Sequence, residues 1–147
     1  MTVMKMAVRL LARREHGCEE LRKKLLAKQL NVDEVDQCLK ELRDKDWLSD
    51  DRFARAFVEA QAALGKGPER IQAMLISRGI SSSSVLLSLE ASEVDWQKLA
   101  IKVLKKKFTS PPVSLKEIAK CINFLNYRGF SSDHVRIAVE SFQPLGE

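Results

Sequence analysis

The chain has few of the side chains that carry out most enzyme chemistry. It contains two histidines, His16 and His134, and three cysteines, Cys18, Cys38 and Cys121. The cysteine spacing fits no zinc site, and an odd number of cysteines argues against a disulfide framework. The scarcity of metal ligands and of general bases near neutral pH argues against a hydrolase or a metalloenzyme. We expect no metal ion, no cofactor and no catalytic residue.

Long apolar runs are also missing. No stretch approaches the roughly 20 apolar residues that cross a bilayer. At the N-terminus, Arg9, Arg13 and Arg14 interrupt the segment that would be apolar in a signal peptide. Hydrophobic residues still make up 45% of the 147 residues, enough for a folded core. We therefore expect a soluble, cytoplasmic protein that contacts no membrane and consists of one domain or a few small modules.

Aromatic residues are scarce as well, at 6% of the chain, which gives little material for a surface that stacks on nucleic-acid bases. Trp47, Trp96 and most phenylalanines stand at apolar positions of helical patterns, so the sequence predicts them in the core. Tyr127 is the exception, because it precedes Arg128 at the expected end of a helix.

The net charge of +5 conceals an uneven distribution along the chain. Residues 1–30 carry eight basic and three acidic side chains, whereas residues 31–60 carry five basic and nine acidic ones. Residues 61–100 are balanced, and residues 101–147 carry eight basic and four acidic side chains. Two basic ends thus flank an acidic segment, so the partner need not be a plain polyanion.

The strongest internal signal is a repeat of fifty residues. Leu21–Leu25 aligns without gaps with Ile71–Leu75 and with Cys121–Leu125. The spacing predicts a helix ended by glycine, then an apolar residue that folds back on the last turn, then a second helix. In the first repeat a glutamine replaces the glycine, so we expect a less ideal cap there. The further aligned columns are Lys28, Arg78 and Arg128; Gln29, Gly79 and Gly129; Leu30, Ile80 and Phe130; Val35, Val85 and Val135; and Leu39, Leu89 and Val139.

Another amphipathic helix precedes each of these helix pairs, so each repeat contains three helices. No alternating run or hairpin turn indicates a strand. We predict an all-α fold of three tandem three-helix repeats that stack into an elongated, curved body, because each repeat is small for a core of its own. The predicted repeats are residues 1–48, 49–91 and 92–147.

Helix-start signals agree with this division. Ser, Asp and Pro residues stand where caps and first helical positions are expected, and Ser114 with Glu117 forms a capping box. The predicted starts lie at Ser49 or Asp50, Pro68, Ser92 with Asp95, Ser114 and Ser131.

Two charged motifs have both a functional and a structural interpretation. The Asp50-Asp51 pair has the composition of an acid/base pair or of metal ligands, but carboxylates at a helix start also satisfy free N–H groups, and we favour that role. Arg78 and Arg128 precede glycines. Each arginine can contact a phosphate or a partner protein, but a cation in a last helical turn also complements the helix dipole, and the two roles are compatible.

Basic runs gather in the two basic ends of the chain. Lys102 and Lys106 fall on one side of their expected helix, as do Lys24 and Lys28. These side chains can meet nucleic-acid phosphates or form a solvated face, and the sequence leaves both interpretations open. The runs are Arg13-Arg14, Arg22-Lys23-Lys24 with Lys28, and Lys102 with Lys105-Lys106-Lys107.

The order of five motifs over nearly the whole chain resembles the RecX family of recombinase regulators. After Glu15, members commonly have a Ser or Thr helix cap where this chain has His16-Gly17. The five motifs are Leu10-Leu11-Ala12-Arg13-Arg14-Glu15, Glu20-Leu21-Arg22-Lys23-Lys24-Leu25, Leu48-Ser49-Asp50-Asp51-Arg52-Phe53-Ala54, Gly65-Lys66-Gly67-Pro68-Glu69-Arg70-Ile71 leading to Leu75 and Arg78-Gly79-Ile80, and Phe124-Leu125-Asn126-Tyr127-Arg128-Gly129-Phe130.

The resemblance implies a regulator without enzymatic activity, made of tandem three-helix repeats. It implies binding in the groove of the RecA–single-stranded DNA filament and inhibition of filament growth, ATP hydrolysis, strand exchange and repressor self-cleavage, in DNA repair and the SOS response. We expect a monomer that meets single-stranded DNA through the filament. The candidate contacts are Arg13, Arg14, Arg22, Lys23, Lys24, Lys28, Arg52, Arg55, Arg78, Lys102, Lys105, Lys106, Lys107 and Arg128, with an acidic patch of Asp44, Asp46, Asp50 and Asp51.

Two rival functions remain. The first is an autonomous DNA-binding protein of the helix-turn-helix type, because each triplet has a suitable size and the chain is basic. Against it, the most basic helix offers lysines rather than the Arg, Asn or Gln side chains that read bases. An enzyme that uses Asp50 and Asp51 ranks third.

Overall fold

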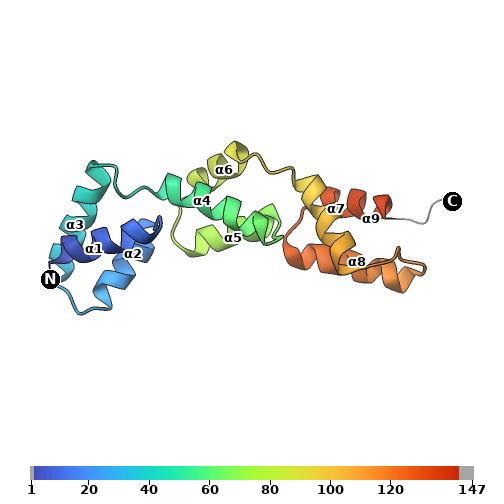
Figure 1. Cartoon of the computed structure of the whole chain (residues 1–147), viewed down its shortest axis with the longest axis horizontal. Helices are drawn as coiled ribbons and strands as arrows, with labels where there is room; N and C mark the ends of the chain where they lie inside the picture. The colour runs from blue at the N-terminus through green and yellow to red at the C-terminus, as the bar shows by residue number, and fades with distance from the viewer. Residues whose placement is uncertain (1, 143–147) are drawn as a thin grey trace. The chain divides into compact units, whose positions relative to one another are not determined.

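The structure is a computed structural model of the chain, in which residues 2–142 are described. Within these residues the chain forms nine helices and no strand, which confirms the all-α prediction (Figure 1). In chain order the helices are α1 (Val3–Arg13), α2 (Cys18–Leu26), α3 (Val32–Asp44), α4 (Asp50–Ala63), α5 (Pro68–Ser77), α6 (Ser82–Ala91), α7 (Trp96–Lys107), α8 (Leu115–Arg128) and α9 (Ser132–Ser141).

Most helices start where the sequence signals predict. The Ser49 hydroxyl accepts a hydrogen bond from the Arg52 amide at the start of α4, and Ser131 does the same for the His134 amide in α9. Helix α7 starts later than expected. Asp95 rather than Ser92 caps it, because the Asp95 carboxylate accepts from the Lys98 amide at 3.0 Å.

The described residues group into two compact units. The first contains the chain up to Phe57 together with Met74–Ala91, and the second contains Val58–Ala73 together with the chain from Ser92 onward. Each unit therefore holds one complete helix triplet and part of the middle triplet. The repeat boundaries expected after residues 48 and 91 follow the sequence repeat and stay predictions.

The aligned apolar columns form the cores. In the first unit, Leu21, Leu25 and Val35 are fully buried, and in the second unit Leu125 and Leu104 are fully buried. Each triplet therefore buries the stripe that its periodicity predicts. The prediction that Trp47 lies in the core is wrong. Its side chain is 52% exposed at the turn after α3, and the Lys45 ammonium lies 5.0 Å from its ring.

The glycine caps form as predicted, and the first repeat differs in the expected way. Gly79 and Gly129 adopt left-handed φ values of 85° and 96°, and the apolar residue after each is buried. Gln29 adopts a φ of 61°, but in the described part of the chain no bond returns from Leu30 to the Leu25 carbonyl. The corresponding bonds of Ile80 and Phe130 are present, both at 3.2 Å.

Glycines also allow close backbone contacts between consecutive triplets. In the second unit, the Gly67 amide donates to the Arg128 carbonyl at 2.8 Å, and the Glu69 amide donates to the Gly129 carbonyl at 2.9 Å. The amino end of α5 thus caps the carboxyl end of α8, an arrangement that satisfies orphan groups of both helices. A Cβ atom at position 67 would lie 2.5 Å from the Gly129 oxygen.

The same position fifty residues earlier lies at the corresponding junction of the first unit, but there it meets side chains rather than backbone. Gly17 lies against Ile80 and Phe53, and a Cβ atom there would lie 3.2 Å from Ile80 Cδ1. Gly17 has no side chain with which to cap α2. Instead the Asp50 carboxylate, at the start of α4, accepts from the Cys18 amide at 2.7 Å. A residue of the next triplet therefore supplies the cap that His16-Gly17 lacks.

Candidate functional site

Helix α7 carries the densest group of cations in the described residues. Its buried side, with Ala100 and Leu104, faces the core of the second unit, and the lysines of the helix are exposed. Lys102 and Lys106 lie one turn apart on an exposed side, and the last turn ends with Lys105, Lys106 and Lys107. Cations in a last turn also complement the helix dipole, which favours this sequence as a helix end.

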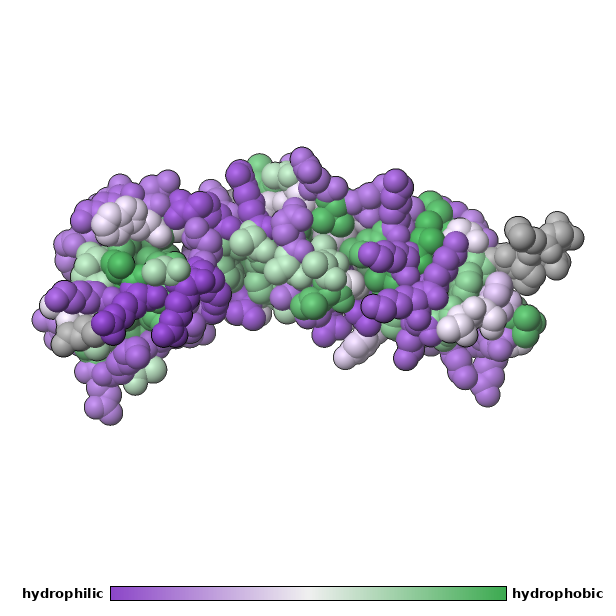
Figure 2. All heavy atoms as spheres, viewed as in Figure 1, coloured by the Kyte–Doolittle hydropathy of each residue, from purple (hydrophilic) through white to green (hydrophobic). Residues whose placement is uncertain are grey.

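A pocket of about 340 Å³ lies beside α7, within the second unit. It is bounded by α7, by the end of α4 and by the last turns of α8. Its lining combines apolar side chains with four cations, and Figure 2 shows hydrophilic and apolar side chains side by side over α7 and α8. We call this site the basic pocket, defined by the apolar residues Leu64, Leu99, Val103 and Phe124 and the cations Lys102, Lys106, Lys107 and Arg128.

Arg128 is held in place at the edge of the basic pocket. Its guanidinium donates to the Leu64 carbonyl at 3.2 Å and lies 5.2 Å from the Phe124 ring centroid. Phe124 and Phe108 form a T-shaped contact with centroids 5.7 Å apart. Arg128 therefore has the structural role expected from its place in the last turn of α8, and it also lines the pocket.

The cations of the basic pocket lack carboxylate partners in the described residues. None of Lys102, Lys106 and Lys107 forms an ion pair within residues 2–142, and Arg128 binds a carbonyl. Several candidates of the first unit are instead neutralised within the chain. The pairs are Arg14 with Glu20 at 2.6 Å, Arg22 with Asp36 at 2.8 Å, Lys24 with Glu20 at 3.9 Å and Arg52 with Glu15 at 2.9 Å.

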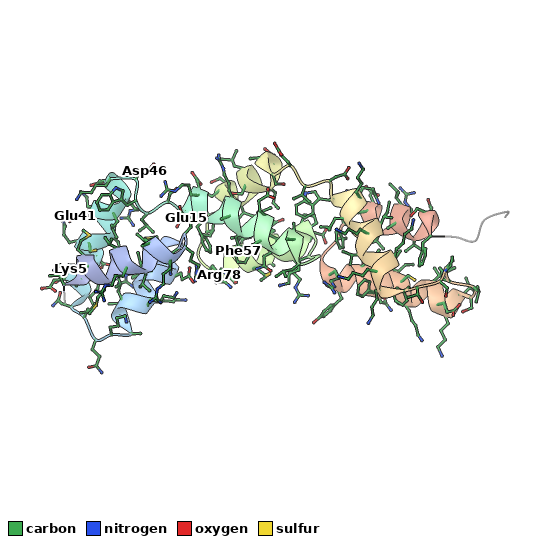
Figure 3. The ribbon with its side chains drawn as sticks, in the orientation of Figure 1. Lys5, Glu15, Glu41, Asp46, Phe57 and Arg78 are labelled. Carbon is green, nitrogen blue, oxygen red and sulfur yellow. The ribbon has the colours of Figure 1, made fainter. Side chains whose placement is uncertain are left out.

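The other predicted contact residues do not line the basic pocket. Arg78 lies with its guanidinium 5.0 Å from the ring of Phe57, and Figure 3 shows the two side chains next to each other. The remaining basic candidates are exposed without an ion pair among the described residues. They are Arg13, Lys23, Lys28, Arg55 and Lys105.

The predicted acidic patch is mostly engaged within the first unit. Asp44 pairs with Lys40 at 3.5 Å, Asp46 pairs with Arg52 at 3.2 Å, and Asp50 caps α2. Asp51 is the exposed member for which the described residues show no ion pair. The structural interpretation of the carboxylate at the start of α4 therefore applies to Asp50, which joins two triplets rather than facing solvent freely.

His16 has a role that the sequence did not reveal. The side chain is buried, its Nδ1 lies 3.0 Å from the Arg14 carbonyl and its Nε2 lies 3.0 Å from Lys24 Nζ. An ammonium only donates, so Nε2 accepts and Nδ1 carries the proton of a neutral ring. Burial is the main cause that lowers the pKa of His16, and the nearby cations act in the same direction.

The described residues hold no cluster of metal ligands, and their cysteines are free. No three His, Cys, Asp or Glu residues among them lie together as a metal site would require. Cys18, Cys38 and Cys121 are free, and burial raises the pKa of each thiol. Arg43 donates to the Cys18 sulfur at 2.9 Å but does not reverse that direction. None of the described helices is long and apolar enough to span a membrane.

Comparison with known families matches the chain to three successive models. They describe the first, second and third three-helix domains of RecX, and they match residues 4–45, 49–85 and 93–139. The order and the places of these matches confirm the three tandem three-helix repeats.

Curated relatives and solved structures agree with these matches. The chain is 38% identical over 133 residues to the regulatory protein RecX of Chromohalobacter salexigens, covering 90% of this chain and 88% of that protein. It is 36% identical over 138 residues to the regulatory protein RecX of Xanthomonas axonopodis pv. citri, covering 93% and 85%. The crystal structure of RecX from Lactobacillus salivarius matches with a TM-score of 0.82 at 19% identity, over 95% of this chain and 94% of that one. At that identity the structural match supports the fold alone.

Proposed function

Because this chain belongs to the RecX family of regulatory proteins, we propose that it binds the RecA–single-stranded DNA filament in the cytoplasm as a monomer. Bound there, it restrains ATP hydrolysis, strand exchange and repressor self-cleavage. Its relatives carry the name of regulatory proteins rather than of enzymes. The residues that we assign to the contact are the cations of the basic pocket.

One observation supports this assignment above the others. The basic pocket presents four cations without carboxylate partners in the described residues, next to apolar side chains. A cation that already pairs with a carboxylate must give up that pair to bind a partner, whereas an unpaired one gives up only solvent. The cations of the basic pocket therefore contribute more to binding than the paired arginines of the first unit.

The test measures ATP hydrolysis by RecA on single-stranded DNA while this protein is added. We expect the rate to fall as the protein concentration rises. The triple variant K102Q/K106Q/K107Q removes three charges but keeps Arg128, which packs against Phe124. If each lost contact weakens binding by about 0.5 kcal/mol, inhibition will require roughly tenfold more protein. The salt dependence of inhibition should also flatten.

A matched control removes three cations that pair with carboxylates. The variant R22Q/K40Q/R136Q has the same change in charge, and each of its targets forms an exposed ion pair. We expect it to inhibit nearly as well as the unchanged protein. Equal loss of inhibition in both triple variants would reject the assigned residues. No inhibition by the unchanged protein at any ratio would reject the function, and tighter binding to bare duplex DNA than to the filament would favour an autonomous DNA-binding protein.

A further inference from the structure

The basic pocket combines two features that point to a particular kind of ligand. Leu64, at the end of α4, is 63% exposed although it lines the pocket, and Leu99 and Val103 of α7 lie beside it. Three lysines and Arg128 surround these apolar side chains. A ligand that fits both features has an apolar group to insert and negative charges on either side of it.

The aromatic side chain of the pocket is not available for base stacking. Arg128 lies over Phe124, and Phe108 meets the same ring edge to face. Stacking on a free aromatic face supplies much of the affinity of single-stranded nucleic acid for proteins. The exposed apolar side chain of Leu64 also offers nothing to a phosphodiester backbone. The pocket therefore fits an acidic peptide better than a nucleic acid.

We propose that the basic pocket binds a short acidic peptide segment that inserts one apolar side chain between Leu64, Leu99 and Val103. Carboxylates on both sides of that anchor bind Lys102, Lys106 and Lys107. The volume of about 340 Å³ lies at the lower end of the range for ligand sites, which suits one large side chain. The inference rests on the proposed function for its partner, because it makes that segment part of the filament protein.

The test uses the full-length protein and measures the fluorescence anisotropy of labelled peptides. One peptide carries a leucine in the middle of six Asp and Glu residues, and a matched peptide carries a serine in its place. We expect the leucine peptide to bind at least tenfold more tightly. L64S should remove this preference for leucine, and K102Q/K106Q/K107Q should lower the affinity for both peptides. The control L87S changes a leucine of α6 that is 60% exposed, close to the 63% of Leu64, and it should alter the binding of neither peptide.

The outcomes separate this inference from the proposed function. Equal binding of the two peptides, or a leucine preference that survives L64S, overturns the inference even where the protein inhibits ATP hydrolysis by RecA. An unlabelled oligothymidylate that binds more tightly than the leucine peptide and competes for the pocket overturns it in favour of nucleic acid. The leucine peptide should also relieve inhibition of the ATPase, and the serine peptide should not. A protein that binds the leucine peptide but leaves the ATPase unchanged rejects the proposed function and, with it, the partner assigned here.

Discussion

The close backbone contact between α5 and α8 makes Gly67 suitable for a stability test, because its φ is not left-handed and a substitution there tests the contact alone. In G67A the new Cβ would lie 2.5 Å from the Gly129 oxygen and 2.5 Å from the Phe130 nitrogen. These are backbone atoms, so no side-chain rotation can relieve the overlap. The two segments must separate by about 1 Å to reach ordinary contact distances.

That separation has a calculable consequence. The hydrogen bonds from the amides of Gly67 and Glu69, at 2.8 and 2.9 Å, would stretch beyond the hydrogen-bond limit. Their loss costs about 1–3 kcal/mol together. Disturbed packing around the buried Phe130 adds about 1–2 kcal/mol, as in other overpacked sites. We therefore expect G67A to lower the free energy of unfolding of the second unit by about 2–5 kcal/mol.

The fifty-residue repeat provides a matched control. In G17A the new Cβ would meet Ile80 Cδ1 at 3.2 Å and Phe53 Cδ2 at 3.4 Å, which are ends of side chains that can move. Alanine is also a poorer N-cap than glycine, so we expect a total loss of at most about 1 kcal/mol. Neither Gly17 nor Gly67 has a positive φ, so the comparison isolates the effect of the close contact.

Urea unfolding followed by circular dichroism measures both variants. With a slope of about 2 kcal/mol per molar urea, the midpoint should fall by about 1–2.5 M in G67A and by at most about 0.5 M in G17A. In G67A, amide hydrogen exchange should accelerate at position 67 and at Glu69, because these amides lose their acceptors. A fall in G67A no larger than that in G17A would refute the close backbone contact.

Three further variants test single residues of the first unit. Because burial lowers the pKa of His16 in the fold, the unfolded chain binds more protons than the folded chain below pH 6.5, so the free energy of unfolding should fall as the pH drops below that value. In H16N this pH-dependent part of the stability should be lost when unfolding curves at pH 5 and pH 8 are compared. An unchanged pH dependence would contradict a buried neutral ring. D50A should lower the free energy of unfolding by about 1–2 kcal/mol in thermal unfolding, because the Cys18 amide loses its acceptor. The control D51A should change it by less than about 0.5 kcal/mol. Equal effects of the two variants would argue against Asp50 as the cap of α2. Q29G should raise the free energy of unfolding by about 0.5–1 kcal/mol in urea unfolding, because Gln29 has a left-handed φ of 61°, which glycine adopts at lower cost, and its side chain is exposed. A loss of stability would show that the glutamine side chain contributes contacts.

The periodic features of this chain could be predicted from the sequence because each depends on residues within one or two turns. The buried columns, the glycine caps and the three helices of each repeat all follow from spacings of three to four residues and from cap residues. The start of α7 was misplaced because Ser92 and Asp95 both have cap chemistry, and only the backbone path selects Asp95. Trp47 was misplaced because it lies after the periodic part of α3, where spacing no longer indicates a face.

The candidate site could be predicted only in part, because charge pairing depends on contacts between distant segments. From sequence alone, Arg52 and Lys102 are equally plausible contact residues. Arg52 meets Glu15, 37 residues away, while Lys102 has no carboxylate partner among the residues that the structure describes. Leu64 gives no signal as a binding residue either, because an exposed leucine is ordinary until it lies beside Val103 at the edge of a pocket.

The three equivalent cap positions show which constraint keeps glycine in the repeat. A left-handed φ alone does not demand glycine, because Gln29 adopts one with its side chain exposed. At Gly79, however, a Cβ would lie 2.5 Å from Glu19 Cγ, and at Gly129 it would lie 2.6 Å from the Arg70 nitrogen. Glu19 and Arg70 belong to the amino-terminal turns of the helices against which these glycines pack. Glycine is therefore required where the carboxyl end of one helix meets the amino end of another, and Gln29 is tolerated because its side chain extends into solvent.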